Sequence, residues 1–139
     1  MDIQFINCKQ WGINEGSLRK CAKKAEKFVP KKKGDLNVIF IDDPYIHGLN
    51  KKYRNCDRPT DVLSFSYLNF ISLKESGLIG EIYISVPTAV KQAKEYKHSL
   101  TDELKKLFVH GLLHIFGYEH DTDEVYKKMA GMEEKILAQ

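Results

Sequence analysis

Residues 107–116 are apolar on every side of a helix, apart from His110, Gly111 and His114. A surface helix carries one apolar stripe, whereas a helix that is apolar all round is a buried one. The rest of the chain must therefore supply enough apolar surface to enclose this segment. A length of 139 residues with a hydrophobic content of 42% suffices for one enclosing domain. We expect a core helix that holds two histidines on a rigid support.

Three of the five histidines in the chain follow the spacing H-x3-H-x5-H, at His110, His114 and His120. Residues four apart lie one above the other on a helix, so His110 and His114 share a face. Gly117 can adopt the left-handed conformation that ends a helix, and the chain can then turn back towards the same point. Three converging neutral imidazoles with one open position are typical of a catalytic zinc site rather than a closed structural one.

The residue after the first histidine distinguishes this segment from the H-E-x-x-H metallopeptidases. Those enzymes have a glutamate there as general base, whereas this chain has Gly111. An ordinary peptidase mechanism is therefore disfavoured, and a glycine would leave room near a metal for a bulky substrate. A metallopeptidase or another metal hydrolase of the zincin type stays open as an alternative, because it would use the same three histidines.

Hydrophobic periodicity and helix caps divide the chain into strands interspersed with helices. Four strands are expected, at residues 3–7, 36–41, 60–65 and 78–85. Five helices are expected: over 15–29, after Asp42-Asp43-Pro44, after Ser85 and Pro87, from a Ser99 cap through the histidines, and from Asp121 onwards. The pattern predicts a sheet with helices packed on it, in a single domain over residues 1–139.

Apolar residues at helical spacing predict which helix faces turn inward. The expected core positions are Leu18, Cys21, Ala22, Ala25 and Phe28 in the first helix, Ile46, Leu49 and Tyr53 in the second, and Val125, Met129, Met132 and Ile136 in the last.

Membrane and disulfide-bonded classes are excluded by the composition. No apolar run approaches the roughly 18 residues of a membrane span, and the N-terminus lacks the layout of a signal peptide, so we expect a cytoplasmic protein. Cys8, Cys21 and Cys56 are odd in number and form no C-x-x-C pair. A zinc ribbon or thioredoxin-type motif is therefore excluded, and buried free thiols are expected.

The formal net charge of +3 allows an acidic partner without requiring one. Basic residues are concentrated between positions 19 and 33. This cluster is either a solvated helix face with its trailing loop or a patch that binds phosphates.

A second unusual stretch, residues 53–65, places two arginines, two aspartates and a Thr-Asp pair around a proline. Taken alone, a polar turn explains it equally well. Together with the histidine segment, it resembles the YbeY family of bacterial endoribonucleases. Residues 110–120 match the family's H-G-x-x-H-x-x-G-[YF]-x-H, and residues 53–65 match its Y-R-x-x-D-x-P-T-D-V-L-S-F. Leu49-Asn50 matches the L-N before that segment, and Gly80-Glu81-Ile82 is similar to the family's G-D-I.

This resemblance implies an α+β fold, with a mixed four-stranded sheet, about five helices and a zincin-like metal helix. The activity it implies is metal-dependent cleavage of single-stranded RNA. The implied role is ribosomal RNA maturation, especially at the 3′ end of the small-subunit RNA, and ribosome quality control. The implied partners are ribosomal RNA and the small ribosomal subunit, one of its proteins, and a ribosome-assembly GTPase.

We expect one Zn²⁺ per chain, bound by His110, His114 and His120 with water at the fourth position. Such a site lowers the pKa of the water to about 7, and other divalent transition metals also suit three imidazoles. His114 is expected to be catalytic as well as a ligand. Arg54 corresponds to the arginine implicated in catalysis in the family, and its planar fork suits phosphate. Arg58 is a weaker second candidate, or a surface charge.

Two acidic residues, Asp61 and Glu119, either orient ring nitrogens of the histidines or form capping and turn hydrogen bonds. Glu119 and Glu81 stand where the family usually has aspartate, which keeps the charge and lengthens the side chain by one methylene. His47 and His98 are expected not to bind metal. A second alternative function is a ribosome-assembly factor whose metal is mainly structural, and in that case the lysine-rich first helix and a protein contact would matter more than hydrolysis.

Overall fold

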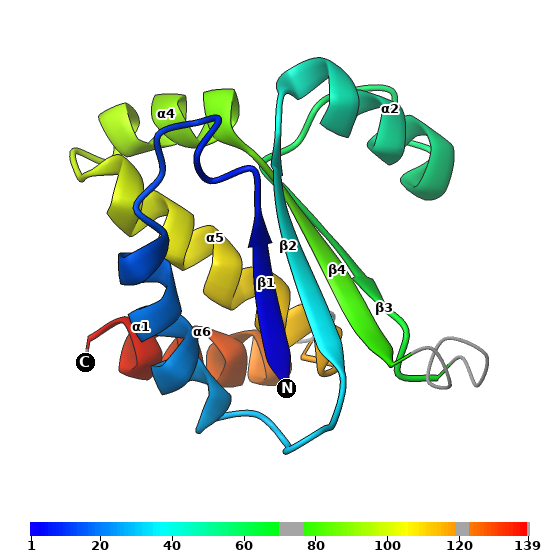
Figure 1. Cartoon of the computed structure of the whole chain (residues 1–139), viewed down its shortest axis with the longest axis vertical. Helices are drawn as coiled ribbons and strands as arrows, with labels where there is room; N and C mark the ends of the chain where they lie inside the picture. Colours follow the sequence, from blue (N-terminus) through cyan, green and yellow to red (C-terminus); the bar gives the residue numbers. More distant parts are fainter. Residues whose placement is uncertain (70–76, 119–122, 139) are drawn as a thin grey trace.

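A four-stranded sheet lies at the centre of the computed structural model, which describes residues 1–69, 77–118 and 123–138 (Figure 1). Its strands are β1 (Asp2–Ile6), β2 (Asp35–Ile41), β3 (Val62–Ser66) and β4 (Leu78–Ser85), in the order β1-β2-β4-β3. β1, β2 and β4 run parallel, whereas β3 pairs with β4 in the antiparallel direction. The sheet is therefore mixed, and β3 ends the order.

The described part of the chain forms five helices: α1 (Glu15–Glu26), α2 (Asp43–Arg54), α4 (Val86–Glu95), α5 (Leu100–Ile115) and α6 (Asp123–Leu137). α1, α5 and α6 lie on one side of the sheet, whereas α2 lies on the other (Figure 1). Four strands in a mixed sheet with five helices confirm the predicted α+β class. None of these helices has the length and apolarity needed to cross a bilayer.

Helix starts follow the predicted caps. The side chains of Asp42, Ser85 and Ser99 accept hydrogen bonds from backbone N–H groups three residues on, which begins α2, α4 and α5. α1 ends at Glu26 instead of continuing to residue 29, because the backbone N–H of Phe28 bonds to Ala25 and tightens the last turn. The predicted last-helix cap at Asp121 lies outside the described residues.

The apolar residues at positions 107–115 of α5 are buried, as its sequence predicts, whereas His110 and His114 are half-buried. Phe108, Leu112 and Leu113 are fully buried among residues of the sheet, α1, α4 and α6. Gly111 has a packing reason that the sequence did not reveal: a Cβ atom there would come within 2.8 Å of Ile82 Cγ2 on β4. The glycine therefore lets α5 lie close against the sheet, which corrects the expectation that it leaves room for substrate.

The expected core stripes are mostly confirmed, with one exception. Leu18, Ile46, Met129 and Ile136 are buried. Tyr53, which we expected in the core stripe of α2, is 54% exposed. It lies in the last turn of the helix, where its ring packs edge-on against Phe65 at 5.4 Å instead of entering the core.

All three cysteines are free thiols, as expected. Cys8 and Cys21 are buried, and burial raises the pKa of each thiol above its ordinary value. Cys56 is half-buried. Buried thiols with raised pKa values are poor nucleophiles, which agrees with a structural role for Cys8 and Cys21.

Candidate active site

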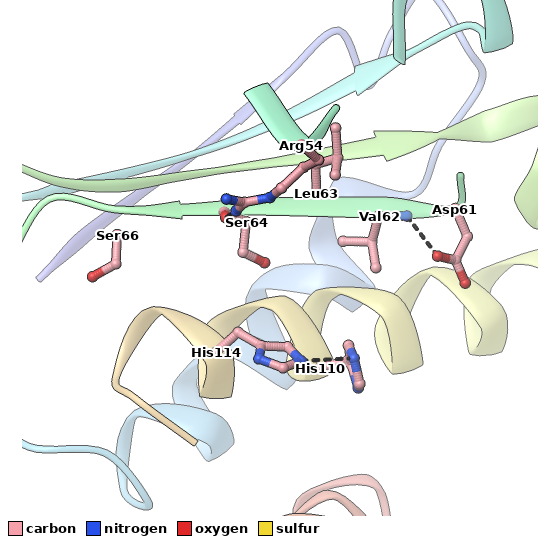
Figure 2. Close-up of a pocket in the computed structure, with 8 residues that line it drawn as sticks. All are labelled: Arg54, Asp61, Val62, Leu63, Ser64, Ser66, His110 and His114. Carbon is pink, nitrogen blue, oxygen red and sulfur yellow. Dashed lines mark hydrogen bonds between the residues drawn. The ribbon is translucent and has the colours of Figure 1, made fainter. Parts of the chain in front are cut away.

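A cavity of about 460 Å³ lies between the edge strand β3 and the core helix α5 (Figure 2). It is lined by Arg54, Asp61, Val62, Leu63, Ser64, Ser66, His110 and His114. The two unusual stretches of the sequence, residues 53–65 and the histidine segment, therefore form opposite walls of one cavity. Charged and imidazole groups from both walls face a shared volume, which is the usual arrangement of a catalytic site.

His110 and His114 converge as the helical spacing predicted. Their Nε2 atoms lie 3.0 Å apart, with the ring centroids 4.5 Å apart. Two nitrogens that each lie 2.0–2.1 Å from one tetrahedral zinc ion are separated by about 3.3 Å. The pair therefore fits a shared metal ion without rearrangement of the helix.

Glu133, on α6, contacts the ring nitrogen of His110 that does not face His114. The Nδ1–H of His110 donates to Glu133 Oε1 at 2.8 Å. A carboxylate that accepts from Nδ1 fixes the tautomer in which Nε2 carries the lone pair, and such partners are typical of histidines that bind metal. The sequence did carry a signal for this contact, because Glu133 lies one helical turn from Met129 on the inward face of α6.

The third predicted ligand, His120, and the predicted partner Glu119 both lie outside the described residues. Within residues 1–69, 77–118 and 123–138, no group of three histidine, cysteine or acidic side chains is placed to hold a metal ion. The structure thus shows two of the three proposed ligands together, and the third stays a prediction from the H-x3-H-x5-H spacing.

Arg54 reaches the cavity from the opposite side of β3. α2 ends there because Asn55 adopts a left-handed conformation, with φ 55°. The guanidinium donates from Nη2 to the Ser64 carbonyl at 2.7 Å, and its central carbon lies 5.0 Å from the Phe65 ring centroid. These two contacts hold a cation at the mouth of the cavity (Figure 2).

Asp61 lines the same cavity, but its hydrogen bonds join the start of β3 to α4. Its carboxylate accepts from the Val62 backbone N–H at 2.7 Å and from Gln92 Nε2 at 3.2 Å. These contacts support the capping interpretation. Arg58 does not line the cavity and is exposed, which favours the surface-charge interpretation.

The two remaining histidines are engaged elsewhere. His47 Nε2 lies 2.7 Å from Asp57 Oδ1, and His98 Nε2 lies 2.6 Å from Glu103 Oε1. Neither histidine lines the cavity.

Glu81 faces away from the cavity, on the α2 side of the sheet. It accepts hydrogen bonds from the hydroxyls of Tyr67 and Tyr83, at 2.7 and 3.2 Å. Burial and the neighbouring carboxylate raise the pKa of both phenols, to about 12 for Tyr83. Both tyrosines are therefore neutral donors at physiological pH.

The basic cluster near the N-terminus is separate from this cavity. Lysines line a second hollow of about 630 Å³ beside Val29 and Pro30: Lys23, Lys27, Lys31, Lys32 and Lys33.

Comparisons with known proteins agree with these features. The family model for endoribonuclease YbeY matches residues 5–139. Endoribonuclease YbeY of Pelotomaculum thermopropionicum is 45% identical over 106 residues, which cover 74% of this chain and 70% of that protein. The Brevibacillus brevis protein of the same name is 41% identical over 132 residues, covering 86% and 82% of the two chains. The solution structure of TM1509 from Thermotoga maritima superposes with a TM-score of 0.61 at 25% identity, covering 98% of this chain and 89% of that one. The chain therefore belongs to the endoribonuclease YbeY family of enzymes.

Proposed function

We propose that this chain is a metal-dependent endoribonuclease that cleaves single-stranded RNA. The observation that supports this most directly is the placement of the Arg54 guanidinium and the His110–His114 pair on opposite walls of one cavity. A metal-binding pair alone would suit many hydrolases. A fixed arginine opposite it suits a substrate whose reacting centre is an anionic phosphodiester.

The metal that we propose is Zn²⁺, one per chain, held by His110, His114 and His120. When bound, such an ion supplies Lewis acidity and lowers the pKa of water to about 7. His114 and His110 contribute the Nε2 atoms that already converge at 3.0 Å. Glu133 orients the His110 ring by accepting from Nδ1. Cobalt, nickel or copper would suit the same donors in vitro.

Arg54 is proposed to bind and orient the phosphate that is cleaved. Negative charge accumulates on the phosphoryl oxygens during the reaction, and a cation fixed before the reaction stabilises that charge without reorganising. The Ser64 carbonyl and the Phe65 ring hold the guanidinium in place, and a guanidinium has five N–H donors. Donors remain for the phosphate after the contact with Ser64 is made.

The biological role that we propose is maturation of ribosomal RNA, at the 3′ end of the small-subunit RNA, together with ribosome quality control in the cytoplasm. Its support is the family membership and the sequence signatures that carry it. Partners proposed on the same ground are the small ribosomal subunit, one of its proteins and a ribosome-assembly GTPase.

The test combines zinc stoichiometry with cleavage of a labelled single-stranded RNA, with chelator and metal add-back. We expect His114→Ala to lose both zinc and cleavage, and Arg54→Ala to keep its zinc and lose most cleavage. His47→Ala and Arg58→Ala are matched controls, because neither residue lines the cavity. Equal zinc content in His114→Ala and wild type would refute the proposed metal site. Undiminished cleavage by Arg54→Ala would refute the proposed binding of the phosphate by Arg54.

Two further outcomes separate the alternatives. Cleavage of a peptide but not of RNA would favour a zincin-type peptidase. A zinc-free variant that still bound ribosomal subunits and restored function in cells would favour an assembly factor with a mainly structural metal.

A further inference from the structure

Four aromatic rings form a continuous row on the side of the sheet that α2 covers. Tyr53 packs edge-on against Phe65 at 5.4 Å, Phe65 packs edge-on against Tyr83 at 5.9 Å, and Tyr83 stacks with Tyr45 at 6.5 Å and an interplanar angle of 22°. We call these four residues the aromatic face. Two rings come from α2 and one each from β3 and β4.

The small apolar core beneath α2 explains only part of this row. Ile41, Ile46 and Leu63 are buried there, with Phe65 and Tyr83 packed against them. Tyr45 and Tyr53, however, are 57% and 54% exposed, so their rings present large apolar surfaces to solvent. Exposed aromatic residues gathered in one place indicate a binding surface more than a folding requirement.

Cations accompany the rings. The last turn of α2 carries Lys51, Lys52 and Arg54. Lys52 Nζ lies 5.1 Å from the Tyr53 ring centroid, and the Arg54 guanidinium lies 5.0 Å from that of Phe65. Acidic residues lie beside the row as well. The Glu81 carboxylate accepts from the Tyr83 hydroxyl, and Asp42 and Asp43 begin α2 next to Tyr45, so the cations gather at the Tyr53 end of the row. Exposed rings interleaved with cations are the composition by which proteins bind single-stranded nucleic acid.

Arg54 joins the aromatic face to the cavity. Ser64 and Phe65 are neighbours on β3, so their side chains point to opposite faces of the sheet. Arg54 stacks on the Phe65 ring, donates to the backbone carbonyl of Ser64, and lines the cavity together with the Ser64 side chain. β3 ends the strand order, so it forms an edge of the described sheet. An RNA strand bound at Arg54 can pass around this edge from one face of the sheet to the other.

We propose that the aromatic face is a stacking subsite for unpaired bases of the RNA strand whose phosphate is bound at Arg54. This inference rests on the proposed function and adds a substrate subsite to it. Bases stack on aromatic side chains without regard to sequence, because every base has a π-face. A duplex keeps its bases stacked inside the helix. The subsite therefore supplies a physical reason for selecting single strands, which the metal and Arg54 do not provide.

The test measures binding of a fluorescent, uncleavable 2′-O-methyl oligoadenylate by anisotropy. We expect the double variant Tyr45→Leu/Tyr53→Leu to bind it about tenfold more weakly, and Tyr45→Phe/Tyr53→Phe, which keeps both rings, to bind like wild type. Tyr96→Leu is the matched control, because Tyr96 is 59% exposed and lies after α4, outside the aromatic face. An abasic ribose-phosphate strand should bind wild type and the leucine variant equally, because it has no bases to stack.

Each remaining result has a definite meaning. Equal oligoadenylate affinity in the leucine variant and wild type would overturn the subsite. The subsite would also be overturned if the leucine substitutions weakened binding of the abasic strand as much as binding of oligoadenylate. A concentration-dependent dimer that the leucine substitutions abolish would show instead that a second copy of the chain occupies the face. The single variants Tyr45→Leu and Tyr53→Leu, checked by circular dichroism, preserve the test if the double variant fails to fold. Failure of wild type to cleave any single-stranded RNA would refute the proposed function, whereas this binding test needs no cleavage.

Discussion

The Nδ1–H of His110 donates a hydrogen bond to Glu133 Oε1 at 2.8 Å, and this bond joins the cavity-lining face of α5 to α6. The two residues are 23 positions apart. The contact fixes which nitrogen of His110 faces the cavity, so α6 contributes to the site without lining it.

Replacing Glu133 should weaken metal binding without removing a ligand. In Glu133→Gln the acceptor loses its charge, and we expect the affinity for zinc to fall about 10- to 100-fold, as for other outer partners of metal-bound histidines. Competition with a chromophoric chelator measures this affinity. Glu134→Gln is the control, because Glu134 is exposed. Unchanged zinc affinity in Glu133→Gln would show that the bond is merely structural.

Arg54→Lys separates the geometry of the cation from its charge. Lysine keeps the positive charge but loses the planar fork and the stacking on Phe65. We expect cleavage of single-stranded RNA to fall about tenfold or more, with zinc content unchanged. Steady-state kinetics on the metal-loaded variant measure the loss. Full activity in Arg54→Lys would mean that a positive charge without the planar guanidinium is enough to bind and orient the phosphate.

Gly111→Ala should destabilise the protein, although alanine is the better helix former. The added Cβ would come within 2.8 Å of Ile82 Cγ2, and overpacking of this kind costs about 1–3 kcal/mol. The helix-propensity gain of up to about 1 kcal/mol offsets only part of that. Denaturant unfolding provides the measurement. Gly131→Ala in α6 is the control, since a Cβ there meets nothing within 4 Å and the substitution should be neutral or stabilising.

Asp43 should make stability depend on pH in the acidic range. Its carboxylate accepts from the hydroxyls of Ser85 and Thr88, at 2.5 and 2.6 Å, and these bonds lower its pKa below the ordinary value of 3.8. A lowered pKa in the folded state means that the carboxylate stabilises the fold above pH 4 and that this contribution is lost as the pH falls through the folded-state pKa.

We therefore expect Asp43→Asn to cost about 1 kcal/mol at pH 6, because the group is half-exposed. The difference from wild type should shrink as the pH approaches 3. Urea unfolding at a series of pH values measures it. Asp42→Asn is the control, because asparagine caps a helix as well as aspartate does. A difference that grew on acidification would contradict the assignment.

Local signals in the sequence were enough to predict most elements of the fold. Caps at Asp42, Ser85 and Ser99 begin helices as expected, because each side chain bonds to a backbone group only three residues away. The pairing of β2 with β4, which are separated in the chain by α2 and β3, depends on contacts between distant segments. Periodicity within one element carries no information about such pairing.

The candidate site likewise has one part that local sequence signals predict and another part that depends on contacts between distant segments. The convergence of His110 and His114 follows from helical geometry alone, and the arrival of Arg54 at the same cavity was expected only from the family resemblance. Glu133 was not predicted, because it lies 23 residues from His110 and only the packing of α6 against α5 brings the two side chains together. Tyr53 was expected in the core, but helical spacing carries no information about the partner ring, and Phe65, against which Tyr53 packs, is itself only half-buried.

The position of β3 at the end of the strand order has a consequence for the kind of polymer the site can accept. A cavity walled by an outermost strand can be approached sideways. Among the described residues no further strand lies beyond β3, so under the function we propose an RNA molecule is laid across the cavity at an internal bond and is not threaded from a terminus. Cleavage within a long folded transcript requires this kind of access, whereas trimming from an end does not.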